Sequence, residues 1–202
     1  MKKMMLPMLA LVLFGFSRDT GKLTEEERKM ANQHLAETRD HMLTVLDGLT
    51  DEQLNFKPGD GSWSIAEGVE HLAILETTFG DLVHKSVADG PKPELKDSLV
   101  FKDEQIMPMV TDRSSKVKTS EAFEPSGKFG SHEETLQAFL DKRSELMDYV
   151  KTTDDDLRNR FNSDFPFGTV DALQLIIFTA AHTERHVLQM EEVMAHADYP
   201  SN

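Results

Sequence analysis

Apolar residues recur at helical spacing in four long stretches of the chain, and no stretch of similar length alternates strictly between apolar and polar residues. This pattern predicts an all-α protein. The four predicted helices cover about residues 24–49, 64–88, 131–150 and 170–197.

Capping boxes mark the start of three of these helices. In this motif a Ser or Thr before the first turn is followed three residues later by Glu, and the two side chains satisfy each other's free backbone N–H groups. The first helix is expected to end after Asp47-Gly48, towards Leu49, and the fourth to begin near Val170. The three boxes are Thr24 with Glu27, Ser64 with Glu67, and Ser131 with Glu134.

The connections between the predicted helices differ greatly in length. The first, around residues 49–62, is short enough for antiparallel neighbours. About forty residues, 89–130, separate the second helix from the third, which is unusually long for a compact domain. A crossover along the bundle would use this chain and let those two helices run parallel. The sequence therefore predicts a four-helix bundle with a long crossover between helices two and three.

The N-terminus has the pattern of a secretory signal peptide. Lys2 and Lys3 precede an apolar run at residues 4–16, which is short for a membrane span, and the small Ser17 follows. We expect residues 1–17 to be removed, leaving residues 18–202 as an exported periplasmic or extracellular domain with no stable membrane span. An uncleaved membrane anchor and a buried N-terminal helix in a cytoplasmic protein are the alternatives.

Composition narrows the choice of function. A chain of 202 residues with 39% hydrophobic content is expected to form one domain. Its formal net charge of −14 and the lack of a basic stripe exclude nucleic acid as an expected partner. The absence of cysteine rules out disulfides, thiolate nucleophiles and iron–sulfur clusters, so any metal must bind through nitrogen and oxygen ligands.

Three histidines are the strongest candidates for chemistry. His182 and His186 are four residues apart on the fourth predicted helix, so their side chains share one face. Imidazole is a common ligand of zinc and related divalent ions. His71, on the second predicted helix, can supply a third ligand, and three protein ligands with a position left open are typical of catalytic metal sites. Solvated or core histidines are the competing interpretation.

Several polar residues are placed to assist such a site. Glu67 lies one turn before His71 and is our candidate proton carrier, although capping the helix is its competing role. Glu70 and Gln189 are candidates to support the ligands, with solvent exposure as the alternative for Glu70. Further candidates to line a pocket are His34, His41 and Trp63.

Other metal classes fit the spacing less well. A zincin helix has Glu directly after its first His, whereas here Glu184 comes two residues after His182. Di-iron bundles use Glu three residues before His, and no histidine in the chain has that neighbour. The chain also lacks a P-loop and a Gly-x-Ser-x-Gly motif.

Several motifs together resemble the DinB-like (DinB/YfiT-type) superfamily. LNFKP at residues 54–58, GSWSIAE at 61–67 and EHL at 70–72 are similar to the start of that superfamily's second helix. FGT at 167–169 and AHTERHVLQ at 181–189 are similar to the segment that leads into, and forms, its last helix. The resemblance covers about residues 28–196. It implies a four-helix bundle in which His71, His182 and His186 hold a divalent ion.

These observations lead to one main hypothesis and one rival. We expect an exported enzyme whose metal ion activates water or a thiol for hydrolysis or group transfer on a small molecule, as a hydrolase or thiol S-transferase. The ion is expected to be Zn or Ni, with Fe and Co as alternatives. The rival is a non-catalytic bundle with a structural or sensing metal. The substrate is unassigned, and a homodimer is an open alternative to a monomer.

Overall fold

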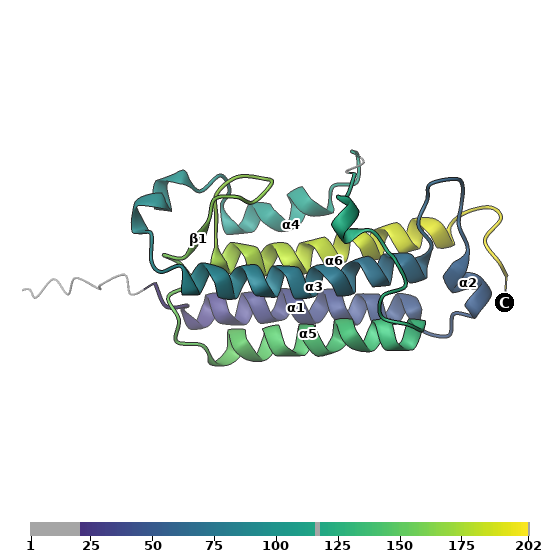
Figure 1. Cartoon of the computed structure of the whole chain (residues 1–202), viewed down its shortest axis with the longest axis horizontal. Coiled ribbons are helices and arrows are strands. Elements are labelled where there is room, and N and C mark those ends of the chain that lie inside the picture. The colour runs from purple at the N-terminus through teal and green to yellow at the C-terminus, as the bar shows by residue number, and fades with distance from the viewer. Residues whose placement is uncertain (1–20, 116–117, 202) are drawn as a thin grey trace, which may run out of the picture.

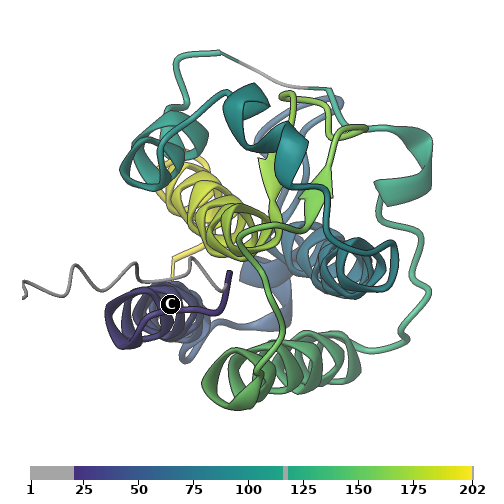
Figure 2. The same cartoon turned by 90° about the vertical axis from the view of Figure 1, so that its left-hand side faces the viewer.

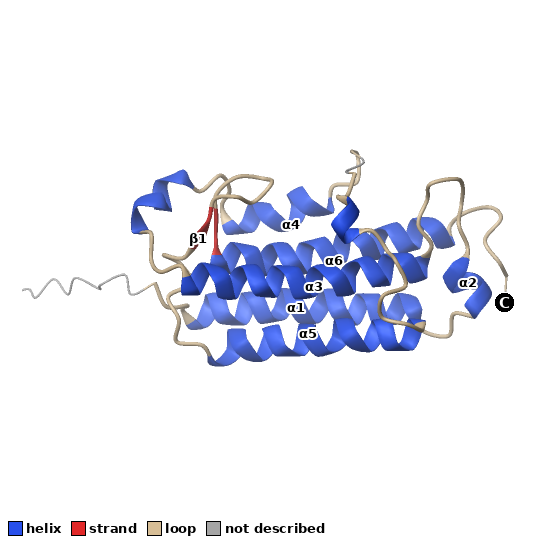
Figure 3. Ribbon diagram, in the orientation of Figure 1, coloured by secondary structure: helices blue, strands red, loops and turns tan. Residues whose placement is uncertain are grey.

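The computed structural model describes residues 21–115 and 118–201, so the predicted signal peptide at residues 1–17 lies outside the described part of the chain. Four long helices form an elongated bundle (Figure 1), and helix is the main secondary structure (Figure 3). The all-α prediction is confirmed. The long helices are α1 (Glu25–Leu46), α3 (Ile65–Ala88), α5 (His132–Thr152) and α6 (Ala172–Met194).

The directions of the four helices confirm the predicted crossover. In Figure 1, α1 and α6 run one way along the bundle, whereas α3 and α5 run the other way. Seen from the end in Figure 2, α1 lies beside α6 and α3 beside α5, and contacts of α1 with α5 and of α3 with α6 close the ring. The chain between α3 and α5 must therefore return along the whole bundle.

The crossover contains helical elements that the sequence pattern did not predict. The longest of them, α4, packs against α6 on the outside of the bundle. Arg185 of α6 fixes its C-terminal end, because the guanidinium donates hydrogen bonds to the carbonyls of Val110 (3.0 Å) and Ser115 (2.8 Å). Pro108 inside this short helix weakened its sequence pattern. The elements of the crossover are η1 (Pro93–Ser98), α4 (Asp103–Thr111) and η2 (Glu121–Phe123).

The three predicted capping boxes are present at the starts of α1, α3 and α5. Three predicted boundaries of the first and fourth helices differ from the structure by two or three residues. The first helix ends at Leu46, and the following residues form a separate short helix, α2 (Asp51–Asn55), with its own capping box. The fourth helix begins at Ala172, because β2 (Val170–Asp171) pairs with β1 (Phe161–Asn162), and it ends at Met194.

Two apolar clusters form the core between the long helices, and the packing is close where α3 meets α6. Gly68 of α3 faces Met190 of α6, and a Cβ atom at Gly68 would lie 3.1 Å from the Met190 Cε atom. The missing side chain lets the two histidine-bearing helices approach each other. Within the described residues, no helix is long and apolar enough to cross a membrane.

Candidate metal centre

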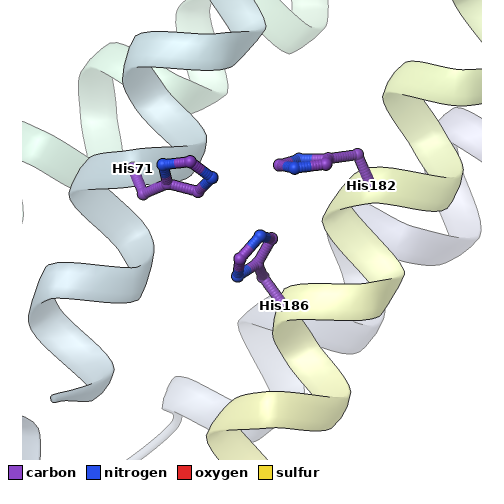
Figure 4. A group of neighbouring side chains, drawn as sticks. All are labelled: His71, His182 and His186. Carbon is purple, nitrogen blue, oxygen red and sulfur yellow. The ribbon is translucent and has the colours of Figure 1, made fainter. Parts of the chain in front are cut away.

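Three histidines from two neighbouring helices converge between α3 and α6 (Figure 4). His71 comes from α3, and His182 and His186 come from successive turns of α6. One nitrogen from each imidazole lies within 4.8 Å of the others. The ring centroids of His71 and His186 are 4.6 Å apart, and those of His71 and His182 are 5.3 Å apart. The tertiary structure thus brings together the three residues that the sequence singled out.

The donor set fits a divalent metal ion. Imidazole nitrogens bind zinc at about 2.0–2.1 Å, so small side-chain rotations would allow these three nitrogens to share one ion. Nδ1 of His186 is buried and has no hydrogen-bond partner among the described residues. A buried polar atom without a partner is uncommon and indicates that the site is built to receive a further group.

A hydrogen bond to the backbone fixes the orientation of the His71 ring. Its Nδ1 atom lies 2.8 Å from the backbone carbonyl oxygen of Phe123 in η2. Because a carbonyl oxygen only accepts hydrogen bonds, Nδ1 must carry the proton, and Nε2 keeps its lone pair. This arrangement is common behind metal-binding histidines, where it sets the tautomer and the direction of the ring.

Burial keeps all three imidazoles in the neutral form that binds metal. It lowers the pKa of His71, which is only 2% exposed, although the Phe123 carbonyl acts in the opposite direction. Burial, with smaller contributions from His71 and Arg185, lowers the pKa of His182 to about 3. Burial and the two other histidines also hold the pKa of His186 well below its usual value. Protons therefore compete weakly for these nitrogens near neutral pH.

Aromatic rings surround the three histidines. The ring centroid of Trp63 lies 4.7 Å from that of His71 and 6.1 Å from that of His186. Phe79 and Phe178 pack against His182. A surface hollow beside the α2–α3 connection is also lined by Trp63, but none of the three histidines lines it. Trp63 therefore borders both this hollow and the histidines.

Glu67 has the contacts of a helix cap. One carboxylate oxygen accepts a hydrogen bond from the Ser64 backbone N–H (2.9 Å), and the other pairs with the Lys57 ammonium group (2.7 Å). These contacts account for both oxygens of the side chain. The catalytic role of Glu67 stays a prediction without support from its position.

Glu70 and Gln189 have different positions. Glu70 is 7% exposed, so the alternative of solvent exposure was wrong. Its carboxylate accepts hydrogen bonds from three backbone N–H groups of the crossover. Burial acts to raise the pKa of Glu70, but these hydrogen bonds together lower it. Gln189 follows His186 by three residues on α6, and its side chain acts to raise the pKa of His186 against the stronger effect of burial.

His41, a candidate to line the pocket, lies apart from the metal centre. Its Nδ1 atom is 3.0 Å from a carboxylate oxygen of Glu184, and its Nε2 atom is 3.4 Å from Glu191. Burial acts to lower the pKa of His41, but the two glutamates outweigh it and raise the pKa. Glu184, the residue between the metal-site histidines in sequence, thus joins α6 to α1 and does not face the site.

Comparison with known proteins agrees with this fold and site. The family model of the DinB superfamily matches residues 34–190, a span that contains all three histidines. The chain belongs to the DinB superfamily. The uncharacterized protein YuaE of Bacillus subtilis (strain 168) is 28% identical over 148 residues, which cover 73% of this chain and 87% of YuaE.

A solved structure supports the same fold. YfiT from Bacillus subtilis, described as a probable metal-dependent hydrolase with an unusual four-helix bundle topology, aligns with a TM-score of 0.56. The alignment covers 88% of this chain and 91% of YfiT at 14% sequence identity. This likeness shows that the chain shares the four-helix bundle fold of YfiT.

Proposed function

We propose that this DinB superfamily protein is a metal-dependent enzyme that catalyses hydrolysis of, or group transfer to, a small molecule. The observation that carries the proposal is the convergence of three neutral imidazoles from α3 and α6. The description of YfiT as a probable metal-dependent hydrolase supports the same class of reaction. Zn and Ni are the metals that we propose first, because both suit imidazole ligands.

The three histidines would hold the ion, and the surrounding residues would control the site. A divalent ion with three neutral ligands supplies a Lewis acid that makes water or a thiol acidic enough to react near neutral pH. The Phe123 carbonyl orients His71. Gln189 follows His186 by three residues on α6 and acts on its pKa. Trp63, Phe79 and Phe178 restrict water around the centre and favour a substrate with an apolar portion.

Metal content tests the proposal directly. Protein purified without an affinity tag is reconstituted with Zn²⁺ or Ni²⁺, and bound metal is measured by elemental mass spectrometry. We expect one equivalent in the wild type and a loss of binding in His71→Ala and His182→Ala. His84→Ala is the matched control, because His84 is an exposed histidine on the same helix as His71. Metal that remains bound in His71→Ala would contradict the three-ligand site.

Two further measurements separate an enzyme from a structural metal site. An enzyme should keep its helical circular dichroism when a chelator removes the metal, because the apolar core of the bundle does not depend on the ion. It should also hydrolyse one member of a panel of esters, amides and phosphoesters, or transfer a thiol, only when it contains metal. Unfolding on chelation, without activity in any assay, would support the structural role.

The proposal includes export of the protein. The basic and apolar pattern of residues 1–17 supports it. An exported enzyme would act on a substrate outside the cytoplasm, where a cytosolic thiol is less accessible. We therefore place water before a thiol as the nucleophile.

A further inference from the structure

Two consecutive residues of α3 hold one segment of the crossover. We call residues 123–128, which leave η2 and pass along α3, the strap. His71 donates a hydrogen bond from Nδ1 to the Phe123 carbonyl at the beginning of the strap, at 2.8 Å. Glu70 accepts hydrogen bonds from the backbone N–H groups of Ser126 (3.0 Å), Gly127 (3.0 Å) and Lys128 (2.9 Å) at its end.

The end of the strap is a backbone anion site that Glu70 fills. Three successive N–H groups turn towards one carboxylate because Gly127 adopts a φ of +74°, a conformation that other residues rarely adopt. A buried carboxylate without such partners would strongly destabilise the fold. Glu70 therefore fixes the conformation of the strap, and both of its oxygens are used in doing so.

The strap has apolar anchors on both sides of this polar contact. The Phe123 side chain packs against the larger core cluster, and Phe129, directly after the strap, packs against the smaller one. The apolar contacts hold the strap near α3, but they do not determine the direction of the Phe123 carbonyl. The hydrogen bonds to Glu70 restrict the backbone further, so that the peptide group of Phe123 keeps one orientation.

We propose that Glu70 is a positioning residue of the metal centre, which acts through the strap by aiming the Phe123 carbonyl at Nδ1 of His71. The carbonyl selects the His71 tautomer that leaves Nε2 free for the metal. This inference rests on the proposed function. A metal ion on Nε2 would make Nδ1–H a stronger donor and so strengthen its hydrogen bond to the Phe123 carbonyl. By thermodynamic reciprocity, the strap in this position raises the affinity for the metal.

A second mechanism gives different expectations. The negative charge of Glu70 could strengthen metal binding directly through space, without the strap. A change in the strap that leaves the Glu70 charge intact separates the two mechanisms. Gly127→Ala is such a change, because an added Cβ atom meets no atom within 4 Å and only the backbone conformation becomes unfavourable.

The experiment compares two variants with matched controls. Glu70→Gln removes the carboxylate on α3 that accepts the hydrogen bonds. Gly127→Ala disturbs the strap backbone that donates them. Glu134→Gln is the control for the first, because Glu134 also accepts a backbone N–H but caps α5, which carries no ligand. Gly48→Ala is the control for the second, because Gly48 has a φ of +72°, also has open space around it, and follows α1.

Two quantities are measured in each protein. Competition with a chelator gives the Kd for Zn²⁺, and ¹⁵N chemical shifts of the His71 imidazole in the metal-free protein give its tautomer. We expect both test variants to bind Zn²⁺ about 10-fold or more weakly and to show a mixture of His71 tautomers. The two controls should keep the wild-type Kd and the Nδ1–H tautomer.

Other outcomes would overturn the inference. If both test variants keep the wild-type Kd and tautomer, Glu70 does not position His71. If only Glu70→Gln weakens Zn²⁺ binding while Gly127→Ala does not, the carboxylate acts by its charge. If the wild type binds neither Zn²⁺ nor Ni²⁺, the proposed function fails, but the tautomer still tests the strap. Gly127→Ala keeps the test valid should Glu70→Gln fail to fold.

Discussion

The guanidinium of Arg143 on α5 forms a two-point ion pair with the carboxylate of Glu76 on α3 in the centre of the bundle. Nε lies 2.6 Å from one carboxylate oxygen and a terminal nitrogen lies 2.8 Å from the other, and neither residue is more than 3% exposed. The remaining N–H groups donate to the Leu35 carbonyl and to the hydroxyls of Thr38 and Thr183. One side chain thus connects all four long helices.

Arg143→Met is expected to destabilise the protein by about 3–5 kcal/mol, because it leaves the Glu76 carboxylate buried without a partner. Urea unfolding followed by circular dichroism measures the change. The double variant Arg143→Met/Glu76→Gln should lose clearly less than the sum of the two single changes, since no unpaired charge is left. Lys142→Met is the control, because Lys142 makes an exposed ion pair with Glu145 on the same helix and should cost less than about 1 kcal/mol. A similar cost for Arg143→Met and Lys142→Met would contradict the prediction.

Trp63 should report metal binding by its fluorescence. It is the single tryptophan of the chain, and its ring lies 4.7 Å from that of His71. A positive ion beside the indole and a rotation of the neighbouring imidazoles should both change its emission. We expect a titration with Zn²⁺ to saturate at one equivalent in the wild type and to be flat in His182→Ala. The same change in His182→Ala would mean that Zn²⁺ binds elsewhere.

Asp171, the N-cap of α6, should make stability depend on pH near neutrality. Burial raises its pKa to about 7, against the effects of Arg158 and of the hydrogen bond from Gln174, while Asp103 and Glu27 act with burial. The folded state then binds this proton more tightly than the unfolded state. The contribution to stability is therefore complete at pH values below the unfolded pKa and is lost as the pH rises through about 7.

Asp171→Asn tests this prediction, because Asn also caps helices well but does not titrate. The free energy of unfolding is measured between mildly acidic and mildly alkaline pH. Relative to the variant, the wild type should lose stability towards alkaline pH with a slope of up to about 1.4 kcal/mol per pH unit. Parallel pH profiles for the two proteins would show that Asp171 does not titrate in this range.

Export should depend on the apolar run near the N-terminus. Expression of the full chain in a bacterium, followed by mass spectrometry of the exported protein, is expected to show a mature chain that begins near residue 18. Leu11→Arg places a charge in the middle of the run and should leave a full-length chain in the cytoplasm. Recovery of intact full-length wild type from the cytoplasm alone would contradict the prediction.

The sequence by itself determined the local parts of this protein. The capping boxes fixed the starts of α1, α3 and α5, because a capping box depends only on residues three apart. The shared face of His182 and His186 followed from helix geometry in the same way. The motifs around these residues and His71 pointed to the DinB superfamily, which supported His71 as the third ligand.

Only the tertiary structure decided what surrounds the metal centre. The contact of His71 with the Phe123 carbonyl joins residues far apart in sequence, and a backbone acceptor has no sequence signature. Arg143 and Glu76 belong to residue types that are usually exposed, and the sequence left solvent exposure open as an alternative for Glu70. Their burial depends on the path of the crossover and on how the helices pack against each other, and such long-range contacts leave little trace in the local pattern of apolar and polar residues.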